Sequence, residues 1–175
     1  NHKHLCLGCQ KQHSVFKHVL FVCTGNVFRS FTAEYCLRDY LQKNNIKNIN
    51  VSSAGINAKG NASIDPVTIQ VLKQLGVSAN NHQQRLLTKD ILKSQDVVIA
   101  MDLKHLKFIK ERFNFDAFLF NELAINKKTS VLDIEDCVED YDNNRKAVEK
   151  FIEMTVVNIN KCIPKVYEKI NTVLI

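Results

Sequence analysis

Residues 19–30 read Val-Leu-Phe-Val-Cys-Thr-Gly-Asn-Val-Phe-Arg-Ser, and this stretch decides the fold. Four consecutive apolar residues predict a buried strand, and the Gly-Asn pair predicts a tight loop after it. An amphipathic stretch follows, with Ala33, Leu37 and Leu41 on one face, and predicts a helix. A strand, a glycine-containing loop and a helix in this order direct backbone N–H groups and the positive end of the helix dipole at one place. The segment therefore predicts an anion site.

Two side chains in this loop are suited to phosphoryl chemistry. Cys23 stands at its entry, where the same field favours the thiolate, which is the nucleophilic form. Arg29 follows after five intervening residues, and its planar guanidinium can hold two phosphoryl oxygens at once. An inert buried cysteine with a surface arginine nearby is the alternative. The strand, loop and helix around the pair favour a phosphate loop of the form Cys-x5-Arg.

Strand-like and helix-like segments alternate along the chain, which predicts a parallel sheet with helices on both faces. Strands are expected at 19–23, 49–53, 96–100 and 117–120, and helices at 30–43, 66–75, 88–94, 103–113 and 143–171. Pro164 predicts a kink in the last helix. We expect an α/β fold with a single domain, built on a four-stranded, parallel, doubly wound sheet. In such a sheet the ligand lies at the carboxyl ends of the strands, here at the loop after the first strand.

Composition limits the class of protein. A chain of 175 residues has the size of one domain. It contains no apolar stretch as long as a membrane span, and its first residues do not resemble a signal peptide, so we expect a cytoplasmic protein with no membrane partner. The net charge of +6 is spread among acidic residues without a block of like charges, so no nucleic-acid partner is expected. The six cysteines show no disulfide framework.

The loop and the segments downstream of it resemble the low-molecular-weight protein tyrosine phosphatases. In that family an apolar strand leads into Cys-x-Gly-Asn-x-x-Arg-Ser and a helix with Ala-Glu, which residues 19–34 match. Ser52 to Gly55, His82 with Arg85, and Val97 to Asp102 match later segments in the family's order. The likeness covers about residues 18 to 171. It implies an N-terminal extension at 1–17 and a phosphatase-like domain at 18–175.

The resemblance implies a cysteine phosphatase that uses no metal and no cofactor. It implies Cys23 as the nucleophile and Arg29 as the residue that binds the phosphoryl group. The implied phosphate-binding loop comprises Thr24, Gly25, Asn26, Val27, Phe28, Arg29 and Ser30. Its implied supporting residues are Asn26, Ser30, Ser53 and His82.

The general acid is a third implied group, because a leaving oxygen departs more readily when it is protonated. The family carries an aspartate before the last helix in an aliphatic-Pro-Asp-Pro context. Matching residues 134–137 to that context selects Asp136 as the acid, with Asp133 as the alternative. Both flanking prolines are missing here. A solvated acidic loop without a catalytic role is the remaining interpretation.

The implied reaction is hydrolysis of phosphotyrosine in a phosphorylated protein through a phosphocysteine intermediate, with inorganic phosphate, sulfate or vanadate as ligands of the loop. A phosphoarginine phosphatase on the same fold is an alternative, although the resemblance to that branch implies a Thr at the place of Val27. An arsenate reductase needs further cysteines, and residues 83–136 contain none. A phosphoprotein-binding or phosphocarrier module without turnover is an alternative of another class. Cys23 argues against an inactive loop and Arg29 against a carrier.

The N-terminal stretch contains His2, His4, Cys6, Cys9 and His13, which are residue types that bind zinc. One Cys-x-x-Cys pair without a second is a weak zinc signal. We expect a tail or an extension packed on the domain instead of a metal site.

Overall fold

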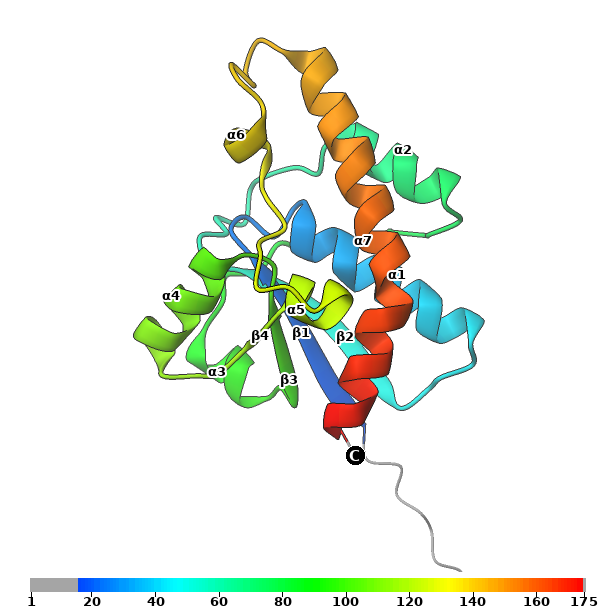
Figure 1. The fold of residues 1–175 in the computed structure, drawn as a ribbon, viewed down its shortest axis with the longest axis vertical. Helices are drawn as coiled ribbons and strands as arrows, with labels where there is room; N and C mark the ends of the chain where they lie inside the picture. The colour runs from blue at the N-terminus through cyan, green and yellow to red at the C-terminus, as the bar shows by residue number, and fades with distance from the viewer. Residues whose placement is uncertain (1–15, 175) are drawn as a thin grey trace, which may run out of the picture.

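The computed structural model describes residues 16–174. Its centre is a parallel sheet with the strand order β2-β1-β3-β4, formed by β1 (Lys17–Cys23), β2 (Ile49–Gly55), β3 (Val97–Ala100) and β4 (Phe118–Leu119). Strand β1 is central, with β2 on one side and β3 on the other (Figure 1). The order therefore reverses at β1, and the carboxyl end of this strand is the switch point at which ligands bind in such sheets. The predicted fold class is confirmed.

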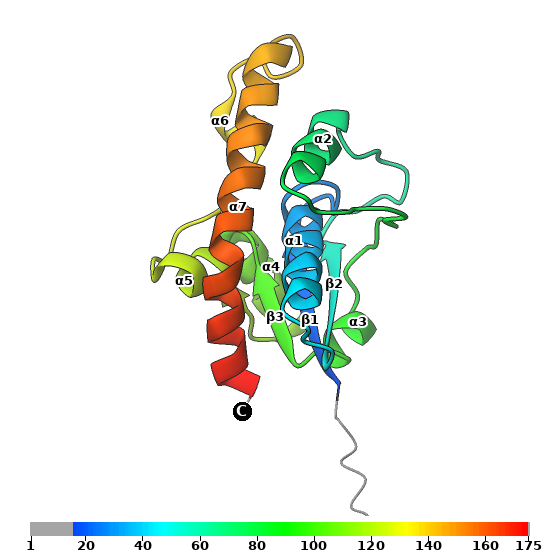
Figure 2. The same ribbon diagram turned by 90° about the vertical axis from the view of Figure 1, so that its right-hand side faces the viewer.

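The two faces of the sheet bury two separate cores, and β1 contributes to both. Val19 and Phe21 lie in the larger core, with α1 (Arg29–Lys43), α2 (Pro66–Gln74) and α7 (Arg145–Leu174). Leu20 and Val22 lie in the smaller one, with α3 (Lys89–Lys93) and α4 (Leu103–Phe113). Figure 2 shows α7 and α3 on opposite sides of the sheet. A strand covered on both faces needs apolar residues at consecutive positions, which explains the unbroken run before the loop.

Short elements differ from the sequence-based expectation. The strand expected at 117–120 is only Phe118–Leu119, and α5 (Phe120–Ile125) follows it directly. A further helix, α6 (Ile134–Cys137), lies in the acidic segment, where no helix was expected. Helices of four to six residues are too short to show a hydrophobic period. Pro164 lies inside α7, which continues through it to Leu174.

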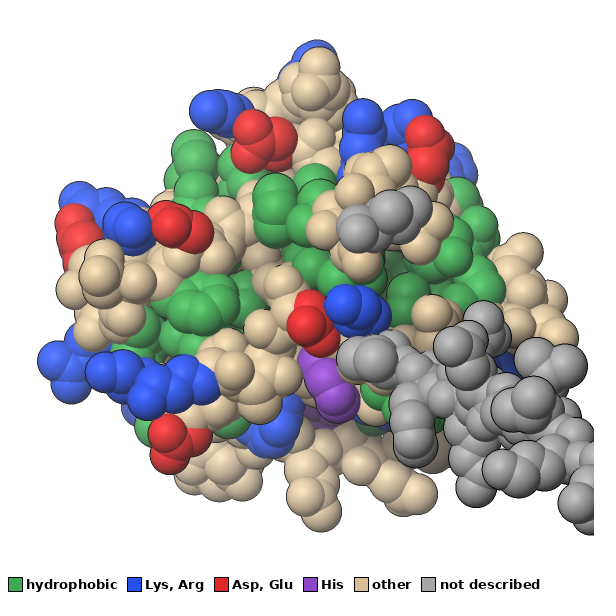
Figure 3. Space-filling model, turned by 90° about the horizontal axis from the view of Figure 1, so that it is seen from below, with side chains coloured by type: hydrophobic (Ala, Val, Ile, Leu, Met, Phe, Trp, Pro, Cys, Tyr) green, Lys and Arg blue, Asp and Glu red, His purple; other side chains and the backbone are tan. Residues whose placement is uncertain are grey.

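The amino ends of the strands lie at the lower end of the molecule in Figure 1. Seen from there, the basic and acidic side chains of the described residues are interspersed (Figure 3). Mixed charges of this kind are typical of a solvated surface. None of the helices in residues 16–174 combines the length and the apolar character that a membrane crossing requires. The histidines and cysteines of the N-terminal stretch, named above as possible zinc ligands, lie outside the described residues.

Candidate active site

Cys23 is the last residue of β1 and is almost fully buried. Its Sγ lies 2.9 Å from Ser30 Oγ and accepts a hydrogen bond from the backbone N–H of Asn26 at 3.3 Å. Ser30 Oγ itself accepts from the Asn26 side chain, so the serine hydroxyl hydrogen is available to the sulfur. Two donors can therefore converge on the sulfur.

Asn26 holds the loop in a left-handed turn. Its φ is 59°, a conformation that asparagine tolerates better than most residues. Its side-chain amide donates to Ser53 Oγ at 2.7 Å, and its carbonyl accepts from His82 Nε2 at 2.8 Å. The structure thus brings Ser53 and His82, two of the implied supporting residues, into contact with Asn26. It adds Glu34, which accepts a hydrogen bond from Ser53 and lies 3.8 Å from His82 Nδ1.

The loop rests directly on the backbone at the carboxyl end of β2 and the residues after it. The carbonyl oxygens of Cys23 and Thr24 accept hydrogen bonds from the N–H groups of Ile56 and Asn57, both at 2.9 Å. A Cβ at Gly55 would lie 2.5 Å from the Thr24 carbonyl oxygen and 2.9 Å from the Asn26 nitrogen. Only glycine permits this approach, because the atoms in the way are backbone. The glycine of the Ser-Ser-Ala-Gly segment therefore has a packing role under the phosphate loop.

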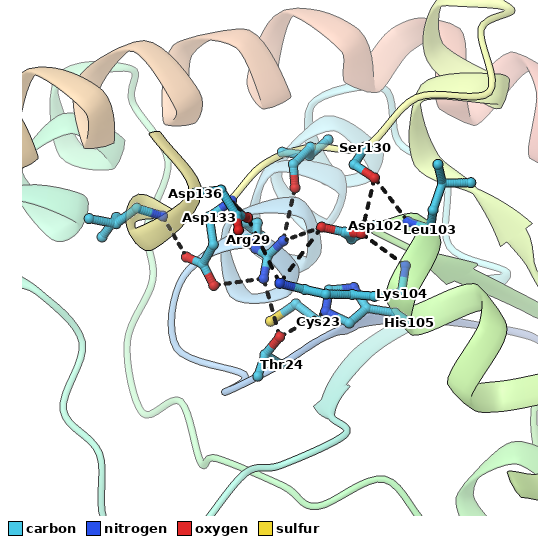
Figure 4. Close-up of polar contacts among 12 residues, drawn as sticks. Cys23, Thr24, Arg29, Asp102, Leu103, Lys104, His105, Ser130, Asp133 and Asp136 are labelled. Atoms are coloured by element: carbon cyan, nitrogen blue, oxygen red, sulfur yellow. Dashed lines mark hydrogen bonds and ion pairs between the residues drawn. The ribbon is translucent and has the colours of Figure 1, made fainter. Parts of the chain in front are cut away.

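Arg29 begins α1 and is 1% exposed, yet every hydrogen bond of its guanidinium ends reaches a segment outside that helix. Nη1 donates to Asp102 Oδ2 at 3.3 Å and to the Val131 carbonyl at 2.9 Å. Nη2 donates to Thr24 Oγ1 at 3.3 Å and to Asp133 Oδ2 at 2.7 Å. Figure 4 shows these acceptors around the guanidinium, close to Cys23. Cys23 and Arg29 thus share one site at the carboxyl ends of β1 and β3.

The two candidate acids have different surroundings. Asp133 caps α6, accepting from the Ile134 N–H at 2.9 Å through Oδ1, while its Oδ2 binds Arg29. Asp136 accepts from the Asp133 N–H at 2.9 Å through Oδ2, and the same oxygen lies 3.8 Å from Lys104 Nζ. Oδ1 of Asp136 accepts no hydrogen bond within residues 16–174, and its side chain is the more exposed of the two, at 37% against 20%. Figure 4 shows the Asp133 carboxylate bound to the Arg29 guanidinium.

Two further residues of the site, Asp102 and His105, were not assigned a role from the sequence. Burial would raise the pKa of Asp102, but hydrogen bonds from the Lys104 N–H and from Ser130 outweigh it and lower the pKa overall. Its Met-Asp context was part of the resemblance, although it was assigned no role. His105 gave no signal at all. It is fully buried, and burial, followed by the Arg29 charge, lowers its pKa to about 3.

Phe28, one of the implied phosphate-binding residues, directs its side chain into the core. Its ring centroid lies 6.4 Å from that of Phe151 on α7. Phe28 can therefore contribute only backbone to an anion in the loop. The nearest aromatic residue after the acidic segment, Tyr141, is 42% exposed.

Comparison with known proteins adds four findings. Residues 18–171 match the family model described as low molecular weight phosphotyrosine protein phosphatase. The chain is similar to a protein-arginine-phosphatase from Bacillus subtilis, 29% identical over 82% of this chain and 97% of that protein. It is also similar to an arsenate reductase from Staphylococcus aureus, 35% identical over 49% of this chain and 60% of that protein. A solved low molecular weight protein tyrosine phosphatase from T. tengcongensis shares the fold, with a TM-score of 0.73, 25% identity and coverage of 87% of this chain and 99% of that one.

Proposed function

This chain belongs to the low molecular weight phosphotyrosine protein phosphatase family, and we propose that it hydrolyses phosphotyrosine in proteins through a phosphocysteine intermediate. One observation carries the proposal. The Cys23 sulfur accepts donors from its own loop, and the buried Arg29 of the same loop lies at the carboxyl end of the central strand. A nucleophile with a bidentate cation beside it is what displacement at a phosphoryl group requires.

In the proposed first step the Cys23 thiolate attacks phosphorus, and the bond from phosphorus to the tyrosine oxygen breaks. Arg29 and the loop N–H groups bind the three remaining oxygens, where charge accumulates in the transition state. The leaving oxygen takes a proton from a carboxylic acid. In the second step the same carboxylate removes a proton from water, which attacks phosphorus and releases phosphate and the thiolate. Ser30 and Asn26 stabilise that thiolate as the leaving group.

We propose Asp136 as this acid. Both oxygens of Asp133 already accept hydrogen bonds, one from the α6 backbone and one from Arg29, and these two contacts hold the carboxylate on the protein. Asp136 keeps one oxygen without a donor in the described part of the chain and is the more exposed side chain. A phosphoryl group bound to Arg29 would compete with Asp133 for the guanidinium. Asp133 is therefore the alternative acid if it swings towards the leaving oxygen instead.

A phosphoarginine phosphatase is the second candidate, and the match to the Bacillus subtilis protein-arginine-phosphatase over most of both chains favours it. Val27 separates the two proposals, since this apolar residue offers no hydrogen bond to a guanidine nitrogen. The substrate in either case is a phosphorylated protein, and inorganic phosphate, sulfate or vanadate would bind the same loop. A thiolate nucleophile works only while it is reduced, which supports the proposed cytoplasmic location.

Initial rates on a phosphotyrosine peptide, a phosphoarginine-containing protein and p-nitrophenyl phosphate, each with and without a chelator, test the proposal. We expect turnover of the phosphotyrosine peptide, unaffected by the chelator and abolished by Cys23→Ser. Phosphate binding should survive in that variant, because the loop backbone and Arg29 remain. Turnover by Cys23→Ser would refute the mechanism. Phosphate binding without turnover of any phosphoester would identify a binding module.

A further inference from the structure

A buried histidine from a different part of the chain contacts the phosphate loop. His105 lies on α4 and is 0% exposed, and its Nε2 is 2.9 Å from Thr24 Oγ1. The same Thr24 oxygen accepts a hydrogen bond from Arg29 Nη2 at 3.3 Å. His105, Thr24 and Arg29 thus form a line of polar contacts from the interior of the smaller core to the phosphate-binding cation, as Figure 4 shows.

The chemistry of the three groups fixes most of the donor pattern. Arg29 is always a donor, so the Thr24 oxygen is the acceptor of that contact. Burial lowers the pKa of His105 to about 3, so at neutral pH its ring is uncharged, with one N–H and one lone pair. Nδ1 is buried without a partner in residues 16–174. Placing the hydrogen on Nε2 leaves only a lone pair unpaired at Nδ1, and Thr24 then accepts from both neighbours.

The contact matters most when a phosphoryl group enters the site. The phosphoryl oxygens would compete with Asp133, whose helix α6 is separate from the loop, for the Arg29 guanidinium. Thr24 belongs to the loop itself, so its hydroxyl stays beside Nη2 as the loop-side acceptor. Asp102 and the Val131 carbonyl hold the other end, Nη1. A guanidinium held at both ends keeps the plane that bidentate binding requires.

We propose that His105 is a positioning residue for Arg29, which it orients through the Thr24 hydroxyl. The inference rests on the proposed function, since it concerns the same phosphate site. It goes beyond that function in assigning a role to a helix that supplies neither the nucleophile nor the acid. His105 does not touch the sulfur or the phosphoryl group, so its effect should pass through Arg29 alone.

Binding of inorganic phosphate, measured by calorimetry, is the main test, because it reports on Arg29 whether or not the protein turns over a phosphoester. His105→Leu keeps the apolar bulk and removes the polar contact. We expect phosphate affinity and kcat/KM on p-nitrophenyl phosphate to fall together by about ten- to a hundredfold, the usual effect of losing a hydrogen bond near a charged group. His105→Gln, whose amide can still reach Thr24, should recover most of the loss.

Two substitutions of Thr24 form a matched pair. They test the same contact without changing His105, and so they remain informative if His105→Leu does not fold. Thr24→Ser keeps the hydroxyl, whereas Thr24→Val keeps the shape and removes it, so Thr24→Ser should bind phosphate more tightly than Thr24→Val. The double variant His105→Leu with Thr24→Val should bind phosphate no more weakly than the single variant with the lower affinity. The two effects should not add, because both substitutions interrupt the same chain of polar contacts. The rate of Cys23 alkylation by iodoacetamide should not change in His105→Leu.

Two results would overturn the inference. One is normal phosphate affinity in Thr24→Val, which would show that the hydroxyl does not orient Arg29. The other is His105→Leu lowering the melting temperature while phosphate affinity stays normal well below the melt, which would make the histidine purely structural. If the parent binds phosphate and the variants weaken that binding, but no phosphoester is hydrolysed, the positioning role stands and only the proposed enzyme activity fails.

Discussion

Replacing Gly55 by alanine should damage the active site without touching any side chain in it. The added Cβ would lie 2.5 Å from the Thr24 carbonyl oxygen, 2.9 Å from the Asn26 nitrogen and 3.0 Å from the Gly25 carbonyl carbon. An ordinary contact begins at 3.4 Å, so the Thr24 oxygen would have to retreat by about 0.9 Å. All three atoms belong to the backbone of the phosphate loop. The loop therefore moves as a unit, away from the hydrogen bonds that hold it to β2.

The expected size follows from that displacement. A misplacement of roughly 1 Å in catalytic groups costs about a hundredfold in rate, and overpacking of this kind destabilises a fold by about 1–3 kcal/mol. We expect kcat/KM on p-nitrophenyl phosphate to fall about a hundredfold and the urea midpoint to drop. Gly60→Ala is the control, because φ at Gly60 is +79° but nothing lies within 4 Å of the added carbon. It should lower stability by about 1 kcal/mol while activity stays normal.

Steady-state kinetics and urea unfolding of the two variants decide the matter together. A Gly55→Ala protein with kcat/KM within twofold of the parent would refute the reasoning, because it would mean that the loop absorbs the clash without losing its geometry. A Gly60→Ala protein that loses as much activity as Gly55→Ala would show that general destabilisation, not loop displacement, causes the loss.

Three further predictions concern the side chains of the site. Arg29→Lys should lose activity by orders of magnitude in rate assays, because a point charge cannot make the bidentate contact. Near-normal rates in this variant would place Arg29 outside the site. Asp136→Asn should slow phosphotyrosine hydrolysis by about 10²- to 10⁴-fold and p-nitrophenyl phosphate hydrolysis much less, since only the poorer leaving group needs a proton. If Asp133→Asn alone slows the two substrates unequally in this way, Asp133 is the acid. His105→Gln should reduce the loss of unfolding free energy at acid pH, measured by urea unfolding at several pH values. The folded pKa of His105 lies below the unfolded value of 6.5, so the histidine lowers the free energy of unfolding as pH falls from 6.5 towards 3, by about 2–3 kcal/mol at pH 4.5. The same pH dependence of stability in the parent and the variant would show that His105 titrates normally.

The local chemistry of the site could be predicted from the sequence because it lies within one continuous segment. Cys23, Gly25, Asn26 and Arg29 occupy a strand, a turn and a helix start whose residue types specify those conformations directly. The alternation of strands and helices likewise determined a parallel sheet covered on both faces. What the resemblance implied for Ser53 and His82 is matched by their contacts with Asn26.

Contacts between distant segments were decided only by the tertiary structure. His105 is 81 residues from Thr24, and Asp133 is 104 residues from Arg29, so no local pattern marks either pair. Helix α6 escaped prediction because it has only four residues and its start signals, Asp133 and Asp136, are acids that a solvated loop would also carry. A sequence specifies local conformation through backbone preferences, whereas the surroundings of Arg29 depend on where the ends of β1 and β3 bring their loops. That convergence is a property of the folded sheet.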